Sequence, residues 1–331
     1  ELTSARPFRT SALHATLAAK GAVFGSRMGW ERPNYFGPSL DYTWDKPTWL
    51  EASVSEQVAC RSAVAVFDQT SFGKLRVHGP DALALLHLVC TADVDRPVGT
   101  AVYTAMLNSR GGYEADVTVT RVGDSEWLIV TSSASPVRDA DWVRRHVARG
   151  WQVTVEDVTT AYAVFGLMGP RSRELLARIS TADVGAEGFA FGTSRIIDIG
   201  PALVRATRIT SVGELGWELM VPTELATGVW DRVVDAGGDL GLRLAGYHAI
   251  NALRLDKGYR ASVPSWARTA PHWRRGCCSP ATWPVIGPSS VGRRWSGSGP
   301  SGRAAGWRRS SWRTRRPCRR GSAIASARRF S

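Results

Sequence analysis

The amino-acid composition of this chain changes abruptly after residue 260, and that change limits where a fold can form. All 29 acidic residues lie before residue 261. Residues 261–331 contain 15 Arg, 6 Trp and 13 Ser, but no Leu, Lys, Asn, Gln, Met or Tyr. The formal net charge of +13 therefore comes from this segment, because residues 1–260 hold 27 basic and 29 acidic residues. A hydrophobic core must be built within residues 1–260, which are close to neutral.

Three interpretations of residues 261–331 compete. Arg with interleaved Trp could pair with phosphates and stack on bases, as in a nucleic-acid-binding arm. The loss of apolar periodicity is also typical of a disordered tail. The interpretation we favour is a shift of reading frame directly after Tyr259 and Arg260, because an out-of-frame GC-rich message yields this mixture of residues. Resequencing the gene at this point would separate the third interpretation from the other two.

The sequence argues against several cofactors and compartments. A Gly-rich match to the dinucleotide-binding fingerprint, Gly297–Gly302, has neither a strand before it nor a helix after it, so we expect no FAD or NAD binding by this chain itself. Cys60 and Cys90 have no metal-ligand spacing, and we expect no metal site. No run approaches the ~18 apolar residues of a membrane span. With no signal peptide recognised at residue 1, we expect a cytoplasmic or mitochondrial-matrix-like compartment.

A β-hairpin is predicted over residues 101–121. An apolar run ends in the turn sequence Asn108–Gly112, and an alternating strand returns from Tyr113 to Arg121. Asp116 stands in the returning strand, where Asp is disfavoured. A carboxylate held on a rigid strand is a suitable general base or cation partner.

Three further motifs accompany the hairpin in order along the chain: Gly29–Asn34 before it, and Val212–Leu219 and Ala252–Arg260 after it. Together with the hairpin, this set resembles the tetrahydrofolate-binding aminomethyltransferase family over roughly residues 8–260. That family includes the glycine-cleavage T-protein and the C-terminal module of sarcosine and dimethylglycine dehydrogenases. Gly29–Asn34 is similar to the linker that precedes the module in those dehydrogenases.

The remaining pattern predicts a mixed α+β chain. Helices are expected at 12–20, 50–61, 81–90, 136–149, 172–179, 223–236 and 245–257, and strands at 72–78, 126–131, 152–156, 163–168, 203–210 and 217–221. Gly79-Pro80 and Gly169-Pro170 both fall between a strand and a helix, a weak internal repeat. Residues 25–48 are rich in Gly, Pro and aromatics and are expected to be irregular.

The resemblance turns this pattern into an expected fold and domain plan. It implies the aminomethyltransferase fold, in which three subdomains surround a folate channel. Residues 1–48 would be a lead-in segment, residues 49–260 the folate-binding domain, and residues 261–331 an aberrant tail. The third subdomain, a small barrel, would be missing because of that tail.

The hairpin supplies the catalytic candidate. The resemblance implies that Asp116 sits beside the folate nitrogen that accepts the one-carbon unit, where a carboxylate could accept a proton and stabilise an iminium cation. Thr118 shares a face with Asp116 because strand side chains alternate, and could contact the pterin or be an ordinary strand residue. Tyr103 on the partner strand could line the folate pocket or belong to the core.

The later motifs supply the binding candidates. Glu218 could accept two hydrogen bonds from the adjacent donors of the pterin, or be an exposed strand residue. Leu219 and Met220 could add backbone hydrogen bonds. Arg254 could bind the folate or form an internal ion pair, and His248 is interpreted as structural. The family usually carries an aromatic residue, commonly Tyr, where this chain has Ser211.

The resemblance implies a tetrahydrofolate-dependent one-carbon transfer module of a sarcosine or dimethylglycine dehydrogenase-like flavoprotein. An upstream FAD domain, absent here, would oxidise an N-methyl amine to an iminium, and this module would form 5,10-methylenetetrahydrofolate from it. The alternatives are a free-standing glycine cleavage aminomethyltransferase with a lipoylated partner, a non-catalytic folate-binding relative, and a nucleic-acid-binding protein acting through the tail.

Overall fold

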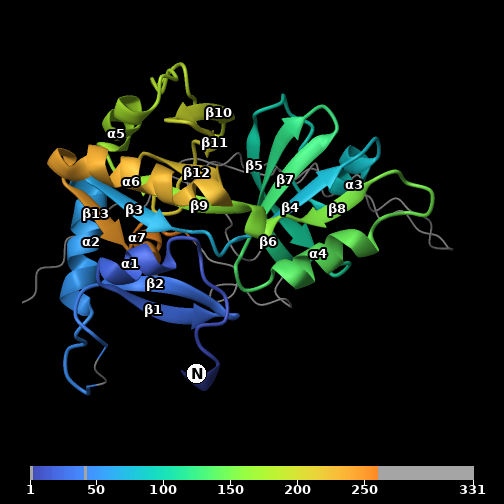
Figure 1. Cartoon of the computed structure of the whole chain (residues 1–331). Coiled ribbons are helices and arrows are strands. Elements are labelled where there is room, and N and C mark those ends of the chain that lie inside the picture. Colours follow the sequence, from blue (N-terminus) through green and yellow to red (C-terminus); the bar gives the residue numbers. More distant parts are fainter. Residues whose placement is uncertain (1–2, 41–42, 260–331) are drawn as a thin grey trace, which may run out of the picture. The chain divides into compact units, whose positions relative to one another are not determined.

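Two β-sheets and a β-hairpin organise the part of the chain that the structure describes. The computed structural model describes residues 3–40 and 43–259 (Figure 1). The first sheet has six strands in the order β10-β11-β12-β9-β3-β13. Its strands are β3 (Val64–Asp68), β9 (Tyr162–Met168), β10 (Ser194–Ile199), β11 (Ala202–Thr207), β12 (Gly216–Pro222) and β13 (Leu242–Ala245). All neighbours are antiparallel except β13 and β3, which are parallel.

Helices cover both faces of the six-stranded sheet. One face packs on α1 (His14–Ala19), α5 (Ser172–Ile179) and α6 (Ala226–Gly237), and its core includes Trp217, Phe165 and Trp230. The other face packs on α2 (Leu50–Ser62) and α7 (Tyr247–Asp256) through a core that includes Phe67 and Met168. Short 3-10 turns lie at Thr3–Ala5, Thr159–Ala161, Thr223–Leu225 and Gly238–Leu240.

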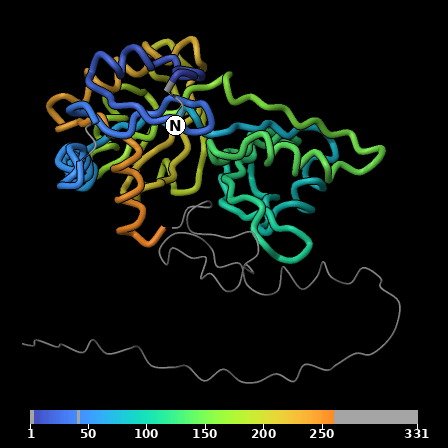
Figure 2. Tube along the Cα trace, turned by 90° about the horizontal axis from the view of Figure 1, so that it is seen from below, coloured from blue at the N-terminus to red at the C-terminus, as the bar shows by residue number. Residues whose placement is uncertain are grey.

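The second sheet is antiparallel, with five strands in the order β5-β6-β7-β4-β8. Its strands are β4 (Gly73–His78), β5 (Ala101–Leu107), β6 (Tyr113–Gly123), β7 (Glu126–Thr131) and β8 (Thr154–Asp157). One face packs on α3 (Ala82–Val89) and α4 (Pro136–Arg145) through side chains such as Val117, Val119 and Ile129. Figure 2 shows that one continuous stretch of chain forms this sheet, whereas the six-stranded sheet uses segments from both sides of that stretch.

The predicted hairpin is confirmed. β5 and β6 pair over their length, with one register shift between Met106 and Leu107. In the turn, the Asn108 side-chain oxygen accepts hydrogen bonds from the backbone N–H groups of Arg110 and Gly112 at 3.0 and 2.9 Å. Gly111 takes a left-handed φ of 74°, which explains the glycines of this turn.

Most predicted elements are present with shifted ends, but three strands and one hairpin were missed. β3, β10 and β13 have no counterpart in the sequence prediction. Residues 25–48, expected to be irregular, instead begin with the β1–β2 hairpin, formed by β1 (Ala22–Arg27) and β2 (Trp30–Phe36). Pro33 obscured this hairpin, because proline is tolerated in a strand only at a sheet edge, which a two-stranded sheet provides.

The two strand-to-helix junctions that suggested an internal repeat are also present. Gly79 between β4 and α3 has φ 128°, and Gly169 between β9 and α5 has φ 133°. At both positions a Cβ atom would run into the backbone of a neighbouring segment, so only glycine fits. The barrel and tail predictions concern residues 260–331, which lie outside the described residues.

A buried carboxylate joins the β1–β2 hairpin to α7. Glu56 on α2 is 2% exposed and accepts hydrogen bonds from the N–H of Phe36 at 2.7 Å and of Gly246 at 3.0 Å. Gly246 immediately precedes α7, so Glu56 satisfies a helix-terminal donor from another element. Burial raises the pKa of Glu56 to about 7.

We expect Glu56→Gln to lower the free energy of unfolding by about 1–3 kcal/mol, because the amide nitrogen would face a buried N–H donor and leave it unpaired. Urea denaturation at pH 5 measures the change, because Glu56 is then protonated in the folded state and the cost of burying its charge no longer offsets the lost hydrogen bond. Glu51→Gln on the same helix is the control, since Glu51 is exposed and we expect a change below about 0.5 kcal/mol. Equal losses in the two variants would contradict the role given to Glu56.

Candidate functional site

The hairpin brings three predicted site residues onto one face of the five-stranded sheet. Tyr103 pairs with Thr118 and Ala105 with Asp116, so all these side chains point the same way. The Tyr103 hydroxyl donates a 2.9 Å hydrogen bond to Oδ2 of Asp116. Tyr103, Asp116 and Thr118 are all half-buried, whereas Val117 points to the opposite face and is fully packed in the core. The face therefore presents an oriented carboxylate that solvent can still reach.

Glu218 stands on one face of the six-stranded sheet, the face that packs toward the five-stranded sheet. On β12 it lies between Thr207 of β11 and Gly166 of β9. Gly166 contributes no side chain, and a Cβ there would press against Oε1 of Gln69. Burial raises the pKa of Glu218 to about 7. Among residues 3–40 and 43–259, the Glu218 carboxylate has neither a hydrogen-bond donor nor an ionic partner, so it is available to donors from a ligand.

The two faces meet through a small apolar cluster. Leu128 and Val130 on β7 share the Asp116 face, because they stand opposite Thr120 and Thr118 of β6. They pack with Val164 of β9 and Met220 of β12, which share the Glu218 face. Thus the structure places Asp116 and Glu218 on facing surfaces of two sheets that touch, although they are separated by about a hundred residues of sequence.

The neighbours of Glu218 differ in orientation. Met220 faces the five-stranded sheet within the apolar cluster, and Leu219 points into the core on the other face. The Leu219 backbone lies within the sheet, opposite Ala206 of β11 and Phe165 of β9. Backbone contacts from Leu219 and Met220 to a ligand remain a prediction.

Ser211 lies near Glu218. Its hydroxyl accepts a 3.2 Å hydrogen bond from Nε2 of Gln69, whose Oε1 is buried without a partner beside Gly166. Position 211, where the sequence resemblance led us to expect an aromatic side chain, thus forms part of a polar Gln69–Ser211 pair. This pair adds an unused acceptor next to the Glu218 carboxylate.

Arg254 and His248 lie on α7. Arg254 donates to Oδ1 of Asn251 at 2.9 and 2.6 Å and to the carbonyl of Tyr259 at 2.9 Å, so its described partners are local and uncharged. A role for Arg254 in binding remains a prediction. The ring centre of His248 lies 5.8 Å from that of Tyr35, on which it stacks, and 4.5 Å from that of Trp49. These contacts agree with a structural role.

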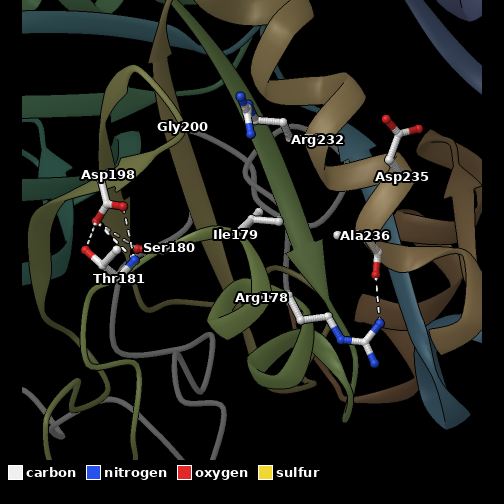
Figure 3. A pocket seen from close by; sticks show the side chains of 9 residues that line it. All are labelled: Arg178, Ile179, Ser180, Thr181, Asp198, Gly200, Arg232, Asp235 and Ala236. Carbon is white, nitrogen blue, oxygen red and sulfur yellow. Dashed lines mark hydrogen bonds between the residues drawn. The ribbon is translucent and has the colours of Figure 1, made fainter.

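An open recess of about 470 Å³ lies elsewhere, between the end of α5 and α6 (Figure 3). Its polar groups are largely satisfied: Asp198 accepts hydrogen bonds from Thr181 and Ser180, and Arg178 pairs with Asp239. No predicted site residue lines the recess. We therefore place the candidate site at the facing sheets and not at this recess.

Other classes of site find no support in the described part of the chain. Residues 3–40 and 43–259 contain no group of three or more His, Cys, Asp or Glu side chains that could hold a metal ion. Within the same residues, no helix has both the length and the apolar character needed to cross a membrane. Cys60 and Cys90 are both buried.

Comparison with known proteins gives consistent results. A family model described as "GCVT N-terminal domain" matches residues 13–265. The chain is 42% identical over 265 residues to 4-methylaminobutanoate oxidase (formaldehyde-forming) of Paenarthrobacter nicotinovorans, covering 78% of this chain and 32% of that protein. It is 35% identical over 306 residues to mitochondrial sarcosine dehydrogenase of Mus musculus, covering 78% and 33%. The chain spans about a third of the length of these relatives.

A solved structure shows the same fold. The crystal structure of glycine cleavage system aminomethyltransferase T from Bartonella henselae superposes with a TM-score of 0.67 at 21% identity, over 80% of this chain and 66% of that one. The expected fold, a mixed arrangement of sheets and helices like that of the T-protein, is confirmed for the region that superposes.

Proposed function

Because this chain belongs to the family of the GCVT N-terminal domain, we propose that it binds tetrahydrofolate between its two sheets and transfers a one-carbon unit to it. The observation that supports this most directly is the half-buried Glu218 carboxylate, which has no described partner and faces the sheet that carries Asp116. A pterin ring offers adjacent N–H donors, and a carboxylate can accept two of them at once. The donor and acceptor chemistry of the site therefore fits this ligand.

We further propose that the one-carbon unit comes from an oxidised N-methyl amine. The relatives named for such amines, 4-methylaminobutanoate oxidase and sarcosine dehydrogenase, are about three times longer than the matched region. An FAD-dependent oxidation would then belong to a separate part of the protein. A free-standing aminomethyltransferase is the alternative, and the likeness to the T-protein structure supports it at the level of fold alone.

The charge and position of each site residue set the role that we propose for it. Glu218 would orient the ring by accepting its hydrogen bonds. The Asp116 carboxylate would stabilise the positive iminium carbon and accept one proton as tetrahydrofolate forms its new carbon–nitrogen bonds. The bond from that carbon to the amine nitrogen breaks, and the amine leaves with the other proton. The hydrogen bond from Tyr103 holds this carboxylate in one orientation. Thr118, on the same face, would offer a hydroxyl to the ring.

We expect Glu218→Gln to have opposite effects on stability and binding. The folded pKa of about 7 lies above the ordinary value of 4.5, so the ionised form destabilises the fold at high pH. The stability of the original protein should fall as pH rises from about 4.5 to 7, and Glu218→Gln should gain about 1–3 kcal/mol relative to it at pH 8. Near pH 4 this advantage should disappear.

Thermal unfolding with and without tetrahydrofolate tests both effects together. At about 100 times the dissociation constant, the ligand should stabilise the original chain by roughly 2.7 kcal/mol, and most of this should be lost in Glu218→Gln. Glu224→Gln, an exposed carboxylate on the segment after β12, is the matched control. A folded original chain that tetrahydrofolate does not stabilise would contradict the proposed function.

A further inference from the structure

Arg32 of β2 is a cation with no acidic partner among the residues that the structure describes. Its guanidinium lies 3.8 Å from the centre of the Tyr247 ring, and Nη1 donates a 3.1 Å hydrogen bond to Oγ of Ser133. Its Nε is buried and has no hydrogen-bond partner. Burial lowers the pKa of Arg32, so its surroundings disfavour the charge. Among the residues that the structure describes, no carboxylate forms an ion pair with it.

Glu31, on the same hairpin, shows how an arginine with an acidic partner is arranged. Arg6 donates two hydrogen bonds to Glu31, from Nε at 2.9 Å and Nη2 at 2.6 Å. Glu31 is the residue directly before Arg32, yet the alternation of the strand sends the two side chains to opposite faces. Arg32 is thus left with a phenol ring and a hydroxyl, in a setting where an unpaired charge is unfavourable.

The groups around Arg32 do not supply the missing charge. Tyr247 is half-buried and shares a 3.2 Å hydrogen bond with Ser71, and the nearby Arg27 adds repulsion. Asp68 influences Tyr247 from a distance, but its carboxylate is engaged by Ser11 and by the N–H of Thr70. An external anion would satisfy Arg32 at little reorganisation cost, because the contact with the Tyr247 ring and the hydrogen bond to Ser133 already hold the guanidinium in place.

The position of Arg32 connects it to the candidate site. Ser133 lies two residues beyond the end of β7. β7 pairs with β6 so that Val130 stands opposite Thr118, and continuing that register brings residue 132 opposite Asp116. Tyr247 begins α7 and packs on the core beneath Phe67, next to the strand that carries Gly166. Arg32 therefore lies where the β1–β2 hairpin, α7 and the end of the five-stranded sheet near Asp116 come together.

We propose that Arg32 binds a carboxylate group of the ligand at this site, an inference that rests on the proposed function. A guanidinium matches the two oxygens of a carboxylate, and the unused donors of Arg32 fit that geometry. Two sources offer this chemistry: the glutamyl tail of tetrahydrofolate, and the carboxylate of an N-methyl amino acid from which the iminium is derived. The carboxylate of the amino acid would lie next to the reacting carbon, whereas the aminobenzoyl group of tetrahydrofolate separates its glutamyl tail from that carbon.

Dissociation constants of the whole chain, measured by calorimetry, test this proposal. The probes are tetrahydrofolate, 6-methyltetrahydropterin (the same ring without a carboxylate), and sarcosine added to the chain saturated with 6-methyltetrahydropterin. Arg32→Met keeps an unbranched apolar stem but removes the guanidinium and its charge. Arg243→Met, at an exposed position on β13, is the matched control.

If the folate tail is the source, Arg32→Met should weaken tetrahydrofolate binding about 10- to 100-fold and leave 6-methyltetrahydropterin unchanged. If the amino acid is the source, only sarcosine binding should weaken by this factor. Unchanged constants for both carboxylates would overturn the proposal. Failure of 6-methyltetrahydropterin to bind the original chain would instead count against the proposed function, and sarcosine, added without the pterin, would still test Arg32.

The melting temperature without ligand separates binding from a structural role. Removing a half-buried cation that has no carboxylate partner among the described residues should leave the melting temperature of Arg32→Met equal to or above that of the original chain. A structural arginine would lower it and leave ligand affinities intact, which would overturn the proposal. Should Arg32→Met fail to fold, Arg32→Lys keeps the charge without the planar guanidinium and should still weaken carboxylate binding.

Discussion

Replacing Lys74 with Met is expected to lower the free energy of unfolding by about 3–5 kcal/mol, among the largest losses a single substitution causes. Lys74 on β4 is fully buried. Its Nζ donates to the backbone carbonyls of Thr70 at 2.9 Å, Thr159 at 2.9 Å and Tyr162 at 2.8 Å. Burial lowers the pKa of the amine to about 7, and Met would leave all three carbonyls without this donor.

The location of these carbonyls explains why losing the Lys74 hydrogen bonds would also affect the candidate site. Thr70 lies on the connection from β3 to β4, where the chain leaves the six-stranded sheet, and Thr159 and Tyr162 lie where it returns from β8 to β9. One side chain thus joins both connections between the sheets. Because Asp116 and Glu218 stand on different sheets, their relative position depends on these connections.

Urea unfolding, followed by tryptophan fluorescence, measures the effect. Lys46→Met is the matched control, since Lys46 is exposed and forms a surface pair with Glu51, for which a change below about 1 kcal/mol is expected. A Lys74→Met protein as stable as the Lys46→Met control would show that the three carbonyls are satisfied by other means.

The local parts of the fold could be predicted from the sequence, and the long-range parts could not. The hairpin at 101–121 was predictable because its turn residues and its alternation both lie within a short segment. β13 is four residues long and pairs in parallel with β3, which lies about 180 residues earlier. No local sequence pattern therefore predicts β13. β3 itself is buried on both faces and lacks alternation, which makes its apolar run ambiguous.

The candidate site shows the same division. The shared face of Tyr103, Asp116 and Thr118 follows from strand periodicity alone. The pKa of Glu218 is raised by burial, and only the folded protein brings the neighbouring strands and the second sheet around this side chain. Arg32 was missed although it belongs to a recognised motif, because its partners Ser133 and Tyr247 come from distant elements. An arginine within a segment of buried aromatic residues was the available signal.

Replacing Asp116 with Asn is expected to slow one-carbon transfer about 10²- to 10⁴-fold while leaving tetrahydrofolate binding nearly unchanged. The amide oxygen can still accept the hydrogen bond from Tyr103, so the geometry of the face should survive and only the charge is lost. Formation of 5,10-methylenetetrahydrofolate from formaldehyde, glycine and tetrahydrofolate provides the assay, with the protein-free rate subtracted. Glycine and formaldehyde generate the iminium in solution, so no flavin domain is needed.

The matched control is Asp124→Asn, an exposed position in the turn between β6 and β7 of the same sheet, for which the original rate is expected. A lost rate with intact binding means that the Asp116 charge acts on the reacting atoms and not on the affinity for folate, as differential stabilisation of a cationic transition state requires. Equal rates for the two variants would remove Asp116 from the chemistry. If both rates also equalled the protein-free rate, the site would bind folate through Glu218 without catalysing transfer, which is the behaviour of a folate-binding relative and not of an aminomethyltransferase.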